Sequence, residues 1–303
     1  MLNLNRLHIL QEFHRLGTIT AVAESMNYSR SAISQQMALL EKEIGVKLFE
    51  KSGRNLYFTE QGEVLASETH AIMAAVDHAR AAVLDSMSEV SGTLKVTSFQ
   101  SLLFTLAPKA IARLTEKYPH LQVEISQLEV TAALEELRAR RVDVALGEEY
   151  PVEVPLVEAS IHREVLFEDP MLLVTPASGP YSGLTLPELR DIPIAIDPPA
   201  LPAGEWVHRL CRRAGFEPRV TFETSDPMLQ AHLVRSGLAV TFSPTLLTPM
   251  LEGVHIQPLP DNPTRTLYTA VREGRQGHPA IKAFRRTLAH VAKESYLEAR
   301  LVE

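Results

Sequence analysis

The sequence predicts a multidomain protein with a small helical domain at its N-terminus, one long connecting helix and an α/β region. Residues 1–62 space their apolar side chains as helices do, and residues 60–90 contain no proline. From residue 93 onward, short β-rich runs alternate with helical ones, an order typical of α/β architecture. A chain of 303 residues is long enough for two or three domains.

The composition limits the class of protein. Hydrophobic residues make up 45% of the chain and charged residues 22%, as in an ordinary globular protein. No apolar run approaches the roughly 20 residues of a membrane span, and the N-terminus lacks the apolar core of a signal peptide. The single cysteine, Cys211, cannot form a disulfide within the chain. We therefore expect a cytoplasmic protein with no membrane partner.

The charge is unevenly distributed along the chain. The net charge of −7 argues at first against a nucleic-acid partner. Residues 1–62, however, hold 7 basic and 6 acidic residues, whereas residues 63–303 hold 23 basic and 31 acidic ones. Any DNA contact of the first segment must therefore rest on individually placed cations rather than on bulk charge.

Three helices are predicted in the first segment, over residues 2–15, 20–26 and 30–44. Gly17 and Gly45 are suited to end the first and third helices. Asn27 tolerates a left-handed backbone in the turn before the third helix, and Ser29 is a good N-cap for it. With Ala23 as a small residue at the helix contact, this order fits a helix-turn-helix.

The third helix exposes short polar groups if its apolar stripe faces inward. Hydroxyls, amides and guanidinium groups of this kind suit base edges and phosphates in a major groove. The candidate DNA-binding residues of this helix are Ser29, Arg30, Ser31, Ser34 and Gln35. The same pattern also fits an ordinary three-helix core with a solvated face.

A hairpin is predicted after the third helix. Two extended pieces, residues 47–50 and 55–58, flank a tight turn at Gly53. Lys51 and Arg54 on this turn would reach a DNA backbone or a minor groove as a wing does. An ordinary surface turn with two charges is the alternative.

Residues 60–90 predict one long helix with a weak coiled-coil seam. Apolar or small residues recur at alternating steps of four and three, a period typical of helices that pair. The seam positions are Leu65, Thr69, Ile72, Val76, Ala79, Val83, Ser86 and Val90. We expect this helix to end near Gly92 and to form a homodimer.

The remainder predicts alternating strands and helices with mainly parallel sheets. The expected strands are 94–98, 123–128, 142–147, 171–175, 194–197, 220–223, 238–242 and 268–271. The expected helices are 102–118, 131–141, 205–214, 227–236 and 279–294.

A family resemblance covers the first 62 residues without a gap. The run from Ala23 to Met37 and its continuation resemble the winged helix-turn-helix of LysR-type transcriptional regulators. The continuation comprises Leu40-Glu41, Ile44-Gly45, Leu48-Phe49, Lys51, Arg54 and Phe58-Thr59-Glu60-Gln61-Gly62. Many members have Gln-Pro where this chain has Arg30-Ser31, and Arg where it has Lys51, so the operator sequence stays open.

The resemblance implies three parts. They are a winged helix-turn-helix DNA-binding domain at 1–62, a linker and dimerisation helix at 63–91, and an effector-binding domain at 92–303. The last would resemble periplasmic binding proteins, with subdomain I at 92–163 and 268–303 and subdomain II at 164–267. The chain would cross between them near 162–166 and 265–268, with a ligand in the cleft.

The resemblance also implies which residues line that cleft. They are Ser98, Phe99, Gln100, Ser101, Glu129, Thr131, Gly147, Asp197, Thr224, Ser225, Phe242 and Ser243. Free amides at the helix start near Ser101 could hold an anion, and the hydroxyls could bind a polar group. The alternative is that Ser101, Thr224 and Ser225 merely cap their helices. The effector is therefore expected to be a small polar or anionic metabolite.

No catalytic residues or cofactors are predicted. His208 and Cys211 are three apart, but two ligands do not make a zinc site. Nucleotide-binding and hydrolase motifs are absent, and the adjacent Glu148 and Glu149 are interpreted as a solvated loop. An α/β enzyme would need such chemistry, and a solute-binding protein would leave residues 1–62 without a role.

The sequence therefore predicts a ligand-responsive regulator of transcription. It would bind double-stranded, two-fold operator DNA as a homodimer or homotetramer, and contact RNA polymerase if it is an activator. Solute-binding protein and α/β enzyme with an accessory helical domain remain the alternatives.

Overall fold

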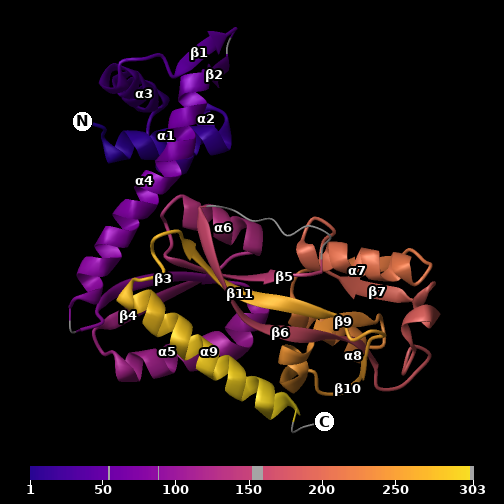
Figure 1. Ribbon diagram of the computed structural model, residues 1–303. Coiled ribbons are helices and arrows are strands. Elements are labelled where there is room, and N and C mark those ends of the chain that lie inside the picture. Colours follow the sequence, from indigo (N-terminus) through magenta and orange to yellow (C-terminus); the bar gives the residue numbers. More distant parts are fainter. Residues whose placement is uncertain (54, 88, 152–159, 301–303) are drawn as a thin grey trace.

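The computed structural model describes residues 1–303 except 54, 88, 152–159 and 301–303. Its N-terminal domain begins with three helices, α1 (Leu4–Leu16), α2 (Ile19–Met26) and α3 (Arg30–Ile44) (Figure 1). Each helix starts on a side-chain cap and ends on a left-handed residue. The caps are Asn3, Thr18 and Ser29, and the left-handed residues are Gly17, Asn27 and Gly45. The predicted turn at Asn27 is confirmed, with φ 56° and ψ 40°.

The wing packs on the helical core through aromatic rings. Strands β1 (Phe49–Ser52) and β2 (Asn55–Phe58) pair antiparallel, the first of them starting two residues later than predicted. The ring centroids of Phe13 and Phe49 lie 5.5 Å apart, and those of Phe13 and Phe58 lie 5.2 Å apart. These contacts fix the direction of the hairpin relative to α1.

Helix α4 (Glu60–Asp85) connects the N-terminal domain with the α/β region (Figure 1). It ends five residues before the predicted end, with Ser86 as its C-cap. Its buried stripe packs within this chain and consists of Gly62, Leu65, Ala66, Thr69, Met73, Asp77 and Ala81. Two members of the predicted seam, Leu65 and Thr69, belong to this stripe, whereas Ala79, Val83 and Ser86 are exposed.

Subdomain I has a parallel sheet at its centre. Strand β3 (Gly92–Ser98) lies between β4 (Leu121–Gln127) and β5 (Val144–Glu149) and is parallel to both. Its helices are α5 (Gln100–Lys117), α6 (Val130–Arg138) and α9 (Pro279–Arg300). Helices α5 and α9 lie side by side, and their apolar faces join the strands in one core.

Two long strands link the subdomains and make the main sheet mixed, so the expectation of mainly parallel sheets is wrong here. Strand β6 (Ile161–Pro176) runs antiparallel to β11 (Thr264–Arg272), and β11 runs antiparallel to β5. Strand β6 pairs with β11 as far as Pro170, and then with β9 (Thr241–Pro244) and β10 (Val254–Pro258). One strand therefore passes from subdomain I into subdomain II.

Subdomain II has its own parallel pair and core. Strand β7 (Pro193–Ile196) pairs with β8 (Arg219–Glu223), and helices α7 (Pro202–Arg213) and α8 (Pro227–Arg235) complete the unit. Two 3-10 helices, η1 (Leu186–Leu189) and η2 (Thr245–Met250), fill its connections. In the part of the chain that the structure describes, no helix is both long enough and apolar enough to cross a membrane.

Candidate functional site

The polar face of α3 is open to solvent. Its buried side consists of Ile33, Met37 and Leu40. All five residues proposed for DNA contact on this helix are exposed, namely Ser29, Arg30, Ser31, Ser34 and Gln35. The Ser29 Oγ accepts the N–H of Ala32 at 3.1 Å and so begins the helix, and it lies 3.0 Å from the Ser31 Oγ. The structure therefore presents these side chains together on one face.

The wing is tied to α3 by a residue that the sequence analysis did not single out for this role. The Glu41 carboxylate accepts the backbone N–H groups of Leu48 at 2.9 Å and Phe49 at 3.2 Å. Burial alone would raise the pKa of Glu41, but these N–H groups and Lys47 lower it below its usual value. Lys51 is exposed on β1, and Arg54 lies outside the described residues.

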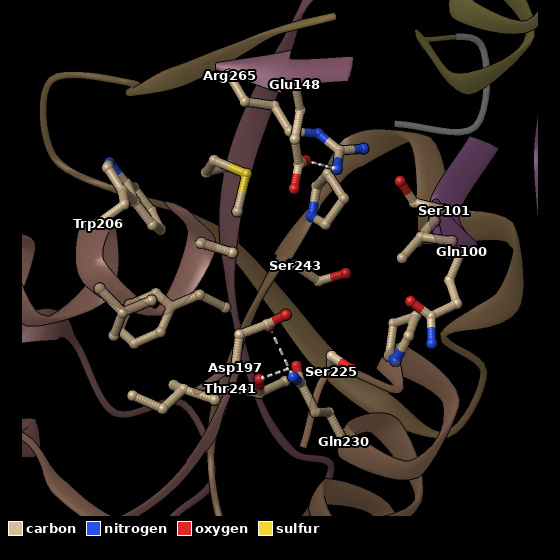
Figure 2. Close-up of a pocket in the computed structure, with 18 of the residues that line it drawn as sticks. Gln100, Ser101, Glu148, Asp197, Trp206, Ser225, Gln230, Thr241, Ser243 and Arg265 are labelled. Atoms are coloured by element: carbon tan, nitrogen blue, oxygen red, sulfur yellow. Dashed lines mark hydrogen bonds and ion pairs between the residues drawn. The ribbon is translucent and has the colours of Figure 1, made fainter. Parts of the chain in front are cut away.

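A cavity lies between the two subdomains of the α/β region (Figure 2). Glu148 on β5 lines it from subdomain I, and Arg265 lines it from β11, one of the two strands that link the subdomains. Asp197, Trp206 and Gln230 line it from subdomain II. In this structure the cavity measures about 70 Å³, room for about five or six water-sized groups.

Eight of the twelve residues expected in the cleft line this cavity, and four do not. Those that do are Phe99, Gln100, Ser101, Glu129, Asp197, Ser225, Phe242 and Ser243. Thr131 is exposed on α6, and Ser98 is buried at the end of β3. Gly147 lies under the ring of Tyr268, where a Cβ would overlap it. The Thr224 hydroxyl accepts the N–H of Asp226 at 3.2 Å within the loop.

Ser101 does not cap its helix. The N-cap of α5 is Phe99, which makes no side-chain capping bond. The Ser101 side chain is 5% exposed, and its Oγ has no hydrogen-bond partner in the described residues. The first N–H groups of a helix also lack intrahelical acceptors. This end of α5 therefore offers donors to a molecule in the cavity.

Arg265 holds two carboxylates at the cavity wall. Its Nη1 lies 2.7 Å from the Glu148 Oε2 and its Nη2 lies 2.8 Å from the Asp169 Oδ2. The Glu148 side chain is 11% exposed, so the expectation of a solvated loop at this position is wrong. The three residues are far apart in the sequence, and no local pattern brings them together.

Asp197 faces the cavity from the end of β7, opposite the Glu148–Arg265 pair (Figure 2). The Gln230 amide donates to its Oδ2 at 3.0 Å and to the Thr224 carbonyl at 2.7 Å. Burial raises the pKa of Asp197 to about 6 against the effect of this hydrogen bond, and the charges of Glu148 and Glu129 add to the rise.

An aromatic wall closes one side of the cavity. The ring centroids of Tyr150 and Trp206 lie 5.4 Å apart. Trp206 also meets Phe242 edge to face at 6.1 Å. The site thus combines flat apolar surfaces with a few polar groups, as small-molecule sites do. Four further residues line the cavity that were not predicted from the sequence, namely Tyr150, Trp206, Gln230 and Arg265. The single tryptophan, in an amphipathic helix, was a usable signal.

Comparisons with known proteins cover almost the whole chain. Residues 4–63 match the bacterial regulatory helix-turn-helix protein, lysR family, and residues 87–293 match the LysR substrate binding domain. The transcriptional dual regulator GltC of Bacillus subtilis (strain 168) is 30% identical over 217 residues, which are 71% of each chain. AlsR, an HTH-type transcriptional regulator of the same organism, is 24% identical over 77% of this chain and 80% of its own.

Solved structures share the fold. A full-length OxyR variant from Pseudomonas aeruginosa superposes with a TM-score of 0.64 at 20% identity, covering 95% of both chains. Full-length CbnR in complex with its target DNA superposes with a TM-score of 0.54 at 20% identity, covering 96% of this chain and 100% of that one. This chain, the OxyR variant and CbnR therefore share the same order of helical domain, long helix and two α/β subdomains.

Proposed function

The chain belongs to the LysR family of bacterial transcription regulators, and from this premise we propose that it binds a two-fold operator and responds to a small molecule in its cleft. It is a DNA-binding regulator with an effector-binding domain, and not an enzyme. Its relatives named above are regulators as well. Since such a protein acts on the chromosome, the proposal places it in the cytoplasm.

The proposed DNA contacts are the exposed polar face of α3 and the wing. The observation that carries this assignment is the exposure of Arg30, Ser31, Ser34 and Gln35 beside a buried apolar stripe. One such helix covers only a few base pairs, so a specific operator needs two copies. Exposed Val64 and Val83 on α4, at 60% and 66%, support pairing through this helix in a homodimer or homotetramer.

The proposed effector site is the cavity between the subdomains. Its supports are the aromatic wall, the uncapped start of α5 and the unpartnered Ser101 hydroxyl. A polar effector fits these groups. The carboxylates that line the same cavity argue against the anionic effector that the helix start suggested. If the protein activates transcription, RNA polymerase is a further partner.

The test is DNA binding by the full-length protein, measured by fluorescence anisotropy on DNA flanking its gene at stated salt concentrations. We expect Arg30→Ala and Ser34→Ala to remove the preference for operator over scrambled DNA, because base contacts carry sequence specificity. Arg213→Ala is the matched control, since Arg213 is an exposed arginine at the end of α7. Full operator preference in the Arg30→Ala, Ser34→Ala double variant would overturn the assignment.

The wing calls for a separate measurement. Lys51→Ala should weaken binding to operator and scrambled DNA alike, and lower the slope of log K against log salt by about one. We propose the same outcome for Arg54→Ala. A selective loss of operator binding in Lys51→Ala would contradict a phosphate-contacting role.

A further inference from the structure

The cavity between the subdomains holds more negative than positive charge. Among the described residues that line it, Glu129, Glu148 and Asp197 are carboxylates and Arg265 is the one cation. Arg265 is already shared by Glu148 and a second carboxylate behind it, Asp169. The Arg265 guanidinium is thus paired within the cavity wall, and no cation among the described lining residues pairs with Glu129 or Asp197.

The carboxylates also act on one another across the cavity. The pKa of Glu129 is raised by burial and by the charge of Glu148. The two acids that raise the pKa of Asp197 come from the opposite subdomain, so the like charges meet where the subdomains face each other. A positive ligand would relieve this repulsion, as would protonation of the carboxylates or opening of the cleft.

A second observation marks the cavity as a place for a ligand. The Ser101 hydroxyl lines it, is 5% exposed, and has no hydrogen-bond partner among the described residues. A buried hydroxyl left without a partner costs free energy, so the native site supplies one from elsewhere. Figure 2 shows Ser101 and Asp197 on different walls of the same space. A molecule that fills it touches both.

We propose that the effector carries a positively charged nitrogen, an ammonium or amidinium group, held between Asp197, Glu129 and Glu148. The proposal rests on the proposed function of the cleft and names the chemical class of its ligand. Trp206 and Tyr150 line the same cavity, and aromatic rings attract a cation that approaches their faces. The rest of the molecule is short, because the cavity measures about 70 Å³.

The charge preference can be tested with four probes that share a four-carbon chain: 1,4-diaminobutane, 4-aminobutyrate, 1,4-butanediol and succinate. Their lengths are alike, and their end groups differ in charge: two ammonium groups, one ammonium and one carboxylate, two hydroxyls, and two carboxylates. Binding to the full-length protein is measured by calorimetry, with thermal unfolding as a second readout. We expect 1,4-diaminobutane to bind at least about tenfold more tightly than butanediol or succinate, because charge-assisted hydrogen bonds are the strong ones.

Two charge-neutralising variants locate the bound nitrogen. Asp197→Asn keeps the shape and the hydrogen bond from Gln230, and Glu129→Gln changes a side chain with no ion pair among the described residues. Each should weaken diamine binding about tenfold or more. The matched control is Asp191→Asn, the same change at an exposed position just before β7, which should leave binding unchanged.

The outcomes separate this proposal from the proposed function. Succinate binding more tightly than the diamine, with loss in Ser101→Ala, would overturn the charge assignment and leave the cleft as the effector site. Diamine binding that persists in both acid variants would also overturn it. If none of the four probes binds at about 10 mM, the cation proposal fails, while operator binding and its response to other metabolites still test the regulator.

Discussion

The Asp77 carboxylate on α4 lies 3.1 Å from the guanidinium of Arg140, where the connecting helix meets subdomain I. The same carboxylate lies 3.6 Å from the Arg272 Nε, and Asp77 is 2% exposed. Burial lowers the pKa of Arg272 to about 10, the charge of Arg140 adds to this lowering, and Asp77 opposes it. One buried acid therefore keeps two arginines of the effector-binding domain beside the connecting helix.

Asp77→Asn should destabilise the protein, because Arg140 and Arg272 lose the charge of the buried carboxylate between them, although Arg272 keeps a longer contact of 3.9 Å to Asp143. Removing one partner of a fully buried ion pair typically costs about 3–5 kcal/mol, and we expect a smaller loss here because the Arg140 and Arg272 side chains are 23% and 12% exposed. The measurement is the thermal unfolding midpoint of the full-length protein, together with the effect of an effector on operator affinity. We expect the midpoint to fall and the coupling between the two sites to weaken.

Asp85→Asn is the control on the same helix. Asp85 pairs with Lys282 at 2.7 Å, but both side chains are exposed by 40% or more. An exposed pair contributes at most about 1 kcal/mol. Equal losses in the two variants would contradict a special role for Asp77.

Gly147→Ala should disturb the cleft without adding any group to it. A Cβ at Gly147 would overlap the ring of Tyr268, the residue directly opposite it on β11. Overpacking of this kind costs about 1–3 kcal/mol. Gly277→Ala is the comparison, since its Cβ would meet only the Ala81 Cβ at 3.8 Å. The thermal unfolding midpoints of the two variants measure this difference. An unchanged midpoint in Gly147→Ala would show that Tyr268 moves aside freely.

The N-terminal domain was predictable because its signals are local. The left-handed turn at Asn27, the cap at Ser29 and the stop at Gly45 each depend on a few neighbouring residues. The exposed face of α3 then follows from the spacing of Ile33, Met37 and Leu40. The resemblance to a known family rested on the same stretch, so pattern and resemblance agreed there.

The cleft was less predictable because its contacts are long-range. Arg265 pairs with Asp169 and Glu148, which lie 96 and 117 residues away along the chain. Loop residues at strand ends, such as Ser225 and Asp197, could be placed near a sheet edge from their order alone. The long antiparallel β6 could not, since its residues 161–170 are partly exposed and do not form an apolar run.

The seam predicted on α4 falls into two environments, for a related reason. A heptad pattern does not say whether a stripe packs on a second copy or on the same chain. Leu65 and Thr69 pack within this chain, while Val83 stays exposed. Asp77, which is buried, lies off the predicted seam altogether, because its burial depends on arginines of another domain.

Glu41→Ala should loosen the wing. Its carboxylate accepts two backbone N–H groups at the start of the hairpin, and leaving such donors without a partner costs about 1–3 kcal/mol. We expect a lower unfolding midpoint and weaker binding to operator and scrambled DNA alike. Glu24→Ala, at an exposed position on α2, is the control for loss of a negative charge near DNA. Unchanged DNA binding in Glu41→Ala would show that the wing keeps its orientation without the hydrogen bonds to Glu41.

Asp197 should make both stability and cation binding depend on pH. Its pKa is raised by burial from 3.8 to about 6, so the folded protein holds a proton that the unfolded chain releases. Stability of the unliganded protein should therefore fall as pH rises from about 4 to about 6, by at most about 3 kcal/mol from this group. Binding of 1,4-diaminobutane should rise over pH 5 to 7, because the charged carboxylate is the form that attracts it.

Asp197→Asn separates this effect from the other titrating groups. The variant should be more stable than the unsubstituted protein at pH 8, where Asp197 is charged, and the difference should shrink at pH 5. The same substitution should flatten the rise of diamine binding with pH. Thermal unfolding and calorimetry at pH 5, 6, 7 and 8 measure both. If Asp197→Asn is less stable at pH 8 by as much as at pH 5, the raised pKa of Asp197 does not govern stability, and the charge of this carboxylate plays no part in the site.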